Sequence, residues 1–187
     1  VPLCGKSIDM IWLSKQGLEV VGIELSPLAI QAFFEENKIP FQKNSLGPFV
    51  KWSAIDQPIT ILEGDIFLFK THYLDKIETT NHSFFHFIYD RASLIALPSN
   101  MRKDYYSLFE ELMNRETKCL LLTIEYTNEK FQGPPFSVME EEIRNFLGGS
   151  FQLSLLIDEK VRPLSPRFLK SGLEEIGEKA YKIEWSS

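Results

Sequence analysis

Residues 7–36, SIDMIWLSKQGLEVVGIELSPLAIQAFFEE, place one short apolar segment between two amphipathic ones, and this arrangement decides the fold. The middle segment, Leu18–Ile23, is apolar and rich in β-branched residues, which is typical of a strand buried on both faces of a parallel sheet. It runs directly into Glu24. We therefore predict a buried strand whose carboxyl end carries a carboxylate, with a helix on either side of it in the chain.

The segment before this strand predicts an amphipathic helix over Ser7–Gln16. Its apolar Ile8, Ile11 and Trp12 fall at the i, i+3, i+4 spacing of one helix face. Gly17 follows, and a glycine suits the left-handed residue that ends many helices. We expect the helix to end there, with the three apolar side chains on its buried face.

The segment after the strand has a strong helix-start signal. Ser26 is a favourable capping residue, and Pro27 fits the first helical position. We expect this helix to reach about Asn37. Its predicted buried face comprises Leu28, Ile30, Phe33 and Phe34.

The rest of the chain continues the alternation of strands and helices. A hairpin is possible where Phe49–Trp52 meets Ile59–Leu62, although residues 40–56 lack a single period. The order predicts one three-layer α/β/α domain over residues 1–187, with a mostly parallel sheet that binds ligands beyond the strands' carboxyl ends. The further predicted elements are strands at Phe84–Tyr89 and Cys119–Ile124, helices at Arg102–Asn114 and Val138–Phe146, and an antiparallel closing pair, Phe151–Asp158 with Lys179–Trp185.

Composition narrows the possible classes of function. A chain of 187 residues with 44% hydrophobic content fits one domain, and a net charge of −6 offers no broad basic surface for nucleic acid. The two cysteines, Cys4 and Cys119, form no CxxC pair, so we expect neither a disulfide nor structural zinc, and a reducing, cytoplasmic location. No apolar run approaches the roughly 20 residues of a membrane span.

Val1–Leu3 look like the end of a further strand, and polar and small residues follow this strand and three others to outline one crevice. Gly5 permits close approach of a ligand to the backbone, and Glu24 lies 19 positions (24 minus 5) later, the offset at which nucleotide-binding folds place a carboxylate for ribose hydroxyls. A turn glycine and a solvated acid explain the spacing equally well. Because no GxGxxG is present, a cofactor without phosphates fits better. The strand-end residues are Leu3-Cys4-Gly5, Glu24, Asp65-Ile66 and Asp90-Arg91.

Several ordered motifs resemble the thiopurine S-methyltransferase family over nearly the whole chain. They are PLCGK at 2–6, VVGIE at 20–24, GDIF at 64–67, DRASLIALP at 90–98 and GPPFSV at 133–138. The resemblance implies a Rossmann-like class I methyltransferase fold that binds S-adenosylmethionine and releases S-adenosylhomocysteine. It implies an enzyme that methylates the sulfur of a small aromatic or heterocyclic thiol without a metal.

The resemblance also assigns roles to particular residues. Glu24 would hold the ribose, Asp65 and Ile66 would border the adenine, and Arg91 would lie near the reacting end and orient a thiolate. A structural pairing of Arg91 with Asp90 is the alternative, and Arg167 is either a second substrate-side cation or an ordinary exposed arginine. The cofactor-binding set is Leu3, Gly5, Glu24, Asp65, Ile66 and Arg91; the substrate-binding set is Pro134, Pro135, Phe136 and Arg167; the catalytic set is Arg91 and Arg167.

The chain departs from the family pattern in ways that affect the acceptor. Ala92-Ser93 replace a usual glycine-containing pair, and Glu125-Tyr126-Thr127 replace an SYD-like stretch. Family members carry an aromatic-rich lid helix before the first strand, and we expect residues 1–187 to lack this helix and part of the first strand. We therefore expect the natural protein to be longer, and we expect it to be monomeric. Two alternatives stay open: an enzyme that methylates selenium or tellurium species, and a catalytically silent domain that binds S-adenosylmethionine or a protein partner.

Overall fold

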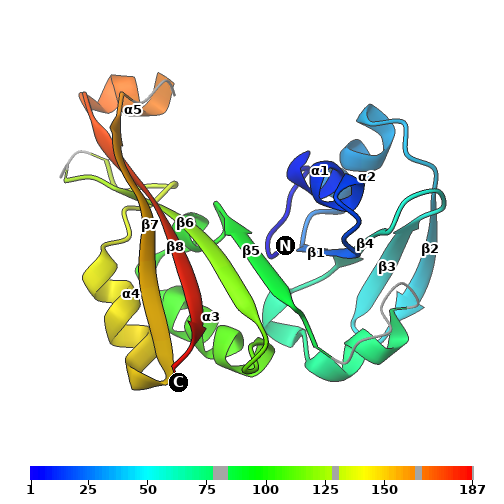
Figure 1. Ribbon diagram of the computed structural model, residues 1–187. Helices are drawn as coiled ribbons and strands as arrows, with labels where there is room; N and C mark the ends of the chain where they lie inside the picture. The colour runs from blue at the N-terminus through cyan, green and yellow to red at the C-terminus, as the bar shows by residue number, and fades with distance from the viewer. Residues whose placement is uncertain (78–83, 128–130, 163–165, 187) are drawn as a thin grey trace. The chain divides into compact units, whose positions relative to one another are not determined.

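The computed structural model describes residues 1–77, 84–127, 131–162 and 166–186. They form two compact units, unit 1 (Val1–Phe85) and unit 2 (His86–Ser187), and each contains its own four-stranded sheet (Figure 1). The predicted α/β class is confirmed, and the single domain stays a prediction. In these described ranges, no helix is both long and apolar enough to cross a bilayer.

The sheet of unit 1 has the strand order β1-β4-β3-β2. β1 (Val20–Glu24) and β4 (Ile59–Glu63) are parallel, and β3 (Phe49–Ala54) pairs antiparallel with both β4 and β2 (Phe41–Leu46). The possible hairpin is confirmed. β2 escaped prediction because its middle residues are all exposed, so it lacks the apolar alternation of a half-buried strand.

Val1 and Cys4 are hydrogen-bonded to β1, and Pro2 and Leu3 between them form a turn. Val1 N donates to Val21 O at 2.8 Å, Ile23 N donates to Val1 O at 3.1 Å, and Cys4 N donates to Ile23 O at 3.0 Å. The two bonds of Val1 go to Val21 and Ile23, the residues on either side of Gly22, and this is the bonding pattern of neighbouring parallel strands. The predicted strand end is therefore supported at Val1, which contacts β1 as a residue of a parallel strand would, but not at Pro2 and Leu3, which form a turn.

The first helix, α1 (Asp9–Lys15), packs against β1 and β4 (Figure 1). The side chains that it buries differ in part from the predicted ones. Ile8 and Trp12 are 67% and 61% exposed, whereas Met10 is fully buried. Met10 Sδ lies 3.0 Å from the position of a Cβ on Gly22. The predicted buried face is therefore wrong for Ile8 and Trp12, because the close packing of Met10 on Gly22 turns them outward. Ile11, in contrast, is half-buried and packs against the core as predicted.

The second helix, α2 (Pro27–Glu36), also packs on β1 and β4. The Ser26 hydroxyl accepts a hydrogen bond from Ala29 N at 3.2 Å, which confirms the predicted cap. Ile30, Phe33 and Phe34 are fully buried as predicted. Leu28 is 78% exposed, so its assignment to the buried face is wrong; it lies in the first turn, before the helix meets the core.

The sheet of unit 2 has the order β5-β6-β8-β7. β5 (Phe87–Arg91) and β6 (Lys118–Glu125) are parallel, and β8 (Ile176–Trp185) pairs antiparallel with β6 and with β7 (Phe151–Val161). The antiparallel closing pair is confirmed. The sheets of both units are mixed, with β1–β4 and β5–β6 as the parallel strand pairs of the described chain.

Three α-helices accompany this second sheet. α3 (Ser99–Leu112) and α4 (Glu140–Leu147) contact each other, and both were predicted within three residues. The acidic first turn of α4 is as expected for a helix dipole. The third helix, α5 (Pro166–Ser171), escaped prediction because six residues are too few to show a helical period.

Candidate functional site

Glu24 organises the strand-end loop of unit 1. Its Oε2 accepts a hydrogen bond from Gly5 N, and its Oε1 accepts one from Ser26 N, both at 2.8 Å. Each carboxylate oxygen keeps a further lone pair for another donor. The predicted pairing of Gly5 with Glu24 is thus a direct contact, and the carboxylate joins the loop after residues 1–4 to the start of α2.

Two residues of this loop have positive φ angles, which for residues other than glycine are unfavourable unless surrounding contacts stabilise them. Leu3 has a φ of 39° and Gly5 a φ of 51°. Positive φ is costly for leucine, and such strain often marks ligand-binding loops. A Cβ built on Gly5 would meet nothing within 4 Å, so the space beside this backbone is open.

The end of β4 lies beside the end of β1. Glu63 is the register partner of Glu24, and Gly64 N donates to Glu24 O at 2.9 Å. Asp65 is exposed, and its Oδ1 caps the short helix η1 (Ile66–Leu68) through Phe67 N at 3.0 Å. Unit 1 therefore brings the predicted Leu3, Gly5, Glu24, Asp65 and Ile66 to neighbouring strand ends.

These residues fit the nucleoside part of S-adenosylmethionine. Glu24 offers two carboxylate oxygens to vicinal hydroxyls, and the open backbone at Gly5 suits a ligand at close range. Ile66, however, is only 3% exposed, which leaves little of its side chain for adenine. Phe67, half-buried beside it, presents more apolar surface.

Cys4 belongs to the same loop, but its thiol is buried and unreactive. Its side chain is 6% exposed, and its Sγ would lie 2.7 Å from a Cβ on Gly22. Burial raises the pKa of this thiol to about 12. Burial, followed by the charge of Asp90, raises the pKa of Cys119 well above its usual value too.

In unit 2, Asp90 and Arg91 end β5, and they differ sharply in exposure. Asp90 is fully buried: its Oδ1 accepts from Ser93 N at 3.1 Å and Leu94 N at 3.3 Å, and its Oδ2 accepts from the Tyr105 hydroxyl at 2.9 Å. Arg91 is exposed, and Ala92 next to it has a φ of 72°. Asp90 therefore fixes the tight turn that presents Arg91.

Asp90 should make the stability of the protein depend on pH. Burial raises its pKa, so the native state holds this proton more tightly than the unfolded state does. The associated stabilisation is complete below about pH 4 and is lost as pH rises through the raised pKa. The free energy of unfolding of wild type, relative to Asp90→Asn, should fall as pH rises; urea titrations at several pH values measure it. A constant difference would contradict the prediction.

The segment Gly133–Ser137 contains the predicted substrate residues, and we name Pro134–Phe136 the acceptor wall. Phe136 N donates to Ile95 O at 2.6 Å, in the short helix η3 (Leu94–Ala96) that follows the Asp90 turn. Gly133 has a φ of 80°, and a Cβ there would collide with the Phe136 ring. The acceptor wall is therefore attached to the turn after Arg91.

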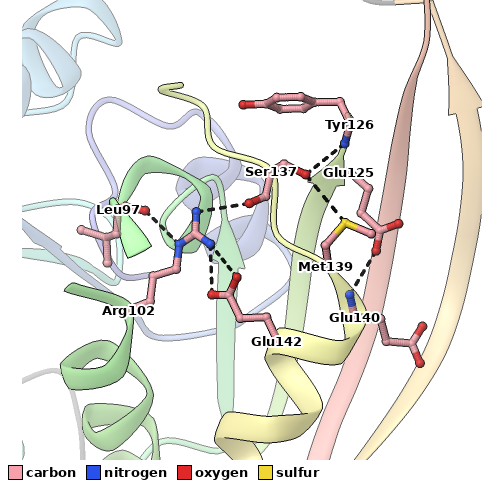
Figure 2. A network of polar contacts seen from close by, with 8 residues as sticks. All are labelled: Leu97, Arg102, Glu125, Tyr126, Ser137, Met139, Glu140 and Glu142. Carbon is pink, nitrogen blue, oxygen red and sulfur yellow. Dashed lines mark hydrogen bonds and ion pairs between the residues drawn. The ribbon is translucent and has the colours of Figure 1, made fainter. Parts of the chain in front are cut away.

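A buried arginine, Arg102, binds the last residue of this segment, Ser137 (Figure 2). Arg102 of α3 is 3% exposed; its Nη1 lies 2.8 Å from Glu142 Oε2, and its Nη2 donates to Ser137 O at 3.3 Å. Its Nε donates to Leu97 O at 3.0 Å. The sequence pattern did not reveal Arg102, because its acidic partner lies 40 residues away.

The predicted Arg167 belongs to α5, and its side chain lies outside what the structure describes. Its neighbour Phe168 is buried, with its ring centroid 5.8 Å from that of Tyr126 and 4.8 Å from that of Phe131. α5 is therefore attached to the segment that follows β6. The roles predicted for Arg91 and Arg167 stay predictions.

Comparison with known proteins identifies the same family as the sequence motifs. Residues 1–186 match the model of the family described as thiopurine S-methyltransferase. A thiopurine S-methyltransferase from Pseudomonas fluorescens is 38% identical over 98% of this chain and 78% of its own.

Solved structures agree in fold. An arsenic(III) S-adenosylmethionine methyltransferase from Chlamydomonas reinhardtii superposes with a TM-score of 0.63 at 13% identity, covering 98% of this chain and 62% of its own. A Burkholderia thailandensis N1-methyltransferase, crystallised with S-adenosylhomocysteine, superposes with a TM-score of 0.53 at 14% identity, covering 97% and 68%. The chain has the class I methyltransferase fold and belongs to the thiopurine S-methyltransferase family, whose members use S-adenosylmethionine as the methyl donor.

Proposed function

We propose that this enzyme transfers a methyl group from S-adenosylmethionine to the sulfur of a small aromatic or heterocyclic thiol. The observation that carries the acceptor assignment is Arg91, an exposed cation at the carboxyl end of β5 on a turn fixed by buried Asp90. A guanidinium stays charged at any physiological pH and orients an anion such as a thiolate. The attached acceptor wall supplies apolar surface for a flat ring.

The residues of unit 1 supply the cofactor side of the proposal. Glu24 binds the ribose hydroxyls through the lone pairs that Gly5 N and Ser26 N leave open. Asp65 lies at the neighbouring strand end, where its exposed carboxylate accepts hydrogen bonds from the nucleoside. When bound, S-adenosylmethionine supplies an activated methyl group.

The acceptor side needs little acid–base chemistry from the protein. Heterocyclic thiols ionise more readily than alkyl thiols, so a strong general base is unnecessary. Arg91 and Arg167 raise the fraction of thiolate by stabilising its charge, and the acceptor wall aligns the sulfur and limits water. Arg91 thereby lowers the barrier without accepting a proton.

Replacement of Arg91 tests this role. Arg91→Ala should mainly lower turnover with 6-mercaptopurine, by roughly 10-fold to 100-fold, the value of one charge-assisted hydrogen bond. Initial rates with saturating S-adenosylmethionine measure the effect. Arg115→Ala, an exposed arginine in the turn before β6, is the control. Equal rates for wild type and Arg91→Ala would remove Arg91 from catalysis.

Two binding and activity measurements separate the remaining alternatives. Calorimetry with S-adenosylmethionine tests both enzyme hypotheses, which an absence of binding would refute; binding without methyl transfer to any acceptor would leave the catalytically silent domain. A screen with 6-mercaptopurine, other thiols and selenite then identifies the acceptor class. Methylation of selenite alone would replace the thiol by an inorganic acceptor.

We also propose that the enzyme acts in a reducing, cytoplasmic compartment. Cys4 and Cys119 are both free and buried, as expected where thiols stay reduced. The monomeric state, which light scattering measures directly, stays a prediction.

A further inference from the structure

Tyr126, which follows β6, contacts two other segments of unit 2: the segment that contains the acceptor wall, and α5. Its hydroxyl donates to Pro135 O at 2.8 Å. Its backbone N donates to the Ser137 hydroxyl at 3.0 Å (Figure 2). Both ends of the residue therefore hold the segment that contains the acceptor wall. Pro135 has no backbone N–H, and Tyr126 supplies a partner for its carbonyl.

The ring of Tyr126 contacts a second segment. It forms a T-shaped pair with Phe168 of α5, with ring centroids 5.8 Å apart and planes at 71°. Phe131 completes the cluster, at 5.5 Å from Tyr126 and 4.8 Å from Phe168. Edge-to-face pairs of this kind add to the stability that burial alone provides. One side chain therefore touches the acceptor wall through its hydroxyl and α5 through its ring.

We propose that Tyr126 is a positioning residue that couples the acceptor wall to α5, the helix of Arg167, and so determines acceptor recognition. The expected effect on KM rests on the proposed function. The coupling between the acceptor wall and α5 does not depend on it. Because Phe136 N is bound to Ile95 O, a displacement of the acceptor wall also reaches the turn after Arg91. Tyr126 acts through these segments and leaves the reacting atoms to other residues.

The hydroxyl of Tyr126 is not a proton donor or acceptor for the reaction. Burial raises its pKa above the ordinary value for tyrosine, so the group stays protonated at neutral pH. Its proton is engaged by Pro135 O. The profile of turnover against pH should therefore have the same shape in Tyr126→Phe as in wild type, which separates positioning from acid–base catalysis.

Tyr126→Phe removes only the hydroxyl and keeps the ring against Phe168. With thiol acceptors we expect KM to rise about threefold to tenfold, the worth of one hydrogen bond, and turnover and cofactor affinity to stay within about twofold. Tyr106→Phe is the matched control: Tyr106 is a buried tyrosine of the same unit whose hydroxyl has no hydrogen-bond partner among the described residues. It should leave KM unchanged.

Hydrogen exchange followed by mass spectrometry tests the coupling independently of any acceptor. Tyr126→Phe should speed exchange in peptides covering both 131–138 and 166–173, whereas Tyr106→Phe should change neither. Unchanged exchange in either segment would overturn the coupling. Faster exchange in both, from an enzyme that methylates no thiol, would support the coupling and refute the proposed acceptor. Faster exchange with an unchanged KM would overturn the role in recognition.

Discussion

Arg102→Met should lower the free energy of unfolding by about 2 to 4 kcal/mol, because removing one partner of a buried ion pair leaves other polar groups unsatisfied. The guanidinium is 3% exposed and serves Leu97 O, Ser137 O and the Glu142 carboxylate. Methionine fills similar volume but donates nothing. The Glu142 side chain is 26% exposed, and its partial hydration keeps the loss below that of a wholly buried pair.

Urea unfolding followed by circular dichroism measures this loss. Arg144→Met provides the control, because Arg144 also pairs with an acid of α4 but its side chain is 52% exposed. An exposed i, i+4 pair contributes only about 0.3 to 0.5 kcal/mol. Similar losses in the two variants would show that the buried network adds no more than a surface pair.

Glu24→Ala should weaken the binding of S-adenosylmethionine by roughly 5-fold to 150-fold, which corresponds to about 1 to 3 kcal/mol. The variant loses the acceptors for ribose hydroxyls and also the contacts that hold Gly5 N and Ser26 N. Isothermal titration calorimetry measures the dissociation constant. Glu24→Gln, which retains one carbonyl oxygen, should lie between alanine and wild type.

The control for Glu24 is its register partner. Glu63 ends the adjacent strand β4, and its Oε2 accepts a hydrogen bond from Trp52 Nε1 at 2.8 Å. Glu63→Gln removes the same charge at the same edge of the sheet and retains an acceptor for Trp52. Cofactor affinity should therefore change little. If both glutamine variants bind equally weakly, general charge rather than a specific contact explains the loss.

The strand ends were predictable from the sequence because strand signals are local. Glu24 and Asp65 each follow a run of apolar residues, and the carboxyl ends of parallel strands meet at one edge of a sheet. The helix faces were less predictable. α1 has only seven residues, so two competing apolar faces fit its pattern, and the close contact of Met10 with Gly22 selects between them.

Long-range polar pairs were not predictable at all. Nothing in the periodicity of α3 distinguishes Arg102 from an ordinary surface arginine, since its partners come from three other segments. The same holds for Tyr126, whose ring and hydroxyl meet segments joined only in the folded chain. Sequence motifs therefore located the residues proposed to touch ligands, but the side chains that position them required the structure.

An enzyme proposed to methylate thiols must leave its own cysteine thiols unmethylated. Cys4 lies one residue before Gly5, in the loop proposed to border the methyl donor, yet its sulfur is packed against Gly22 and its pKa is near 12. At neutral pH almost none of it is thiolate, the form that attacks carbon or exchanges with disulfides. Cys119 is equally protected. Burial thus keeps both cysteines unreactive and leaves the proposed thiol substrate as the reactive sulfur. Incubation with the methyl donor should therefore leave the mass of the protein unchanged.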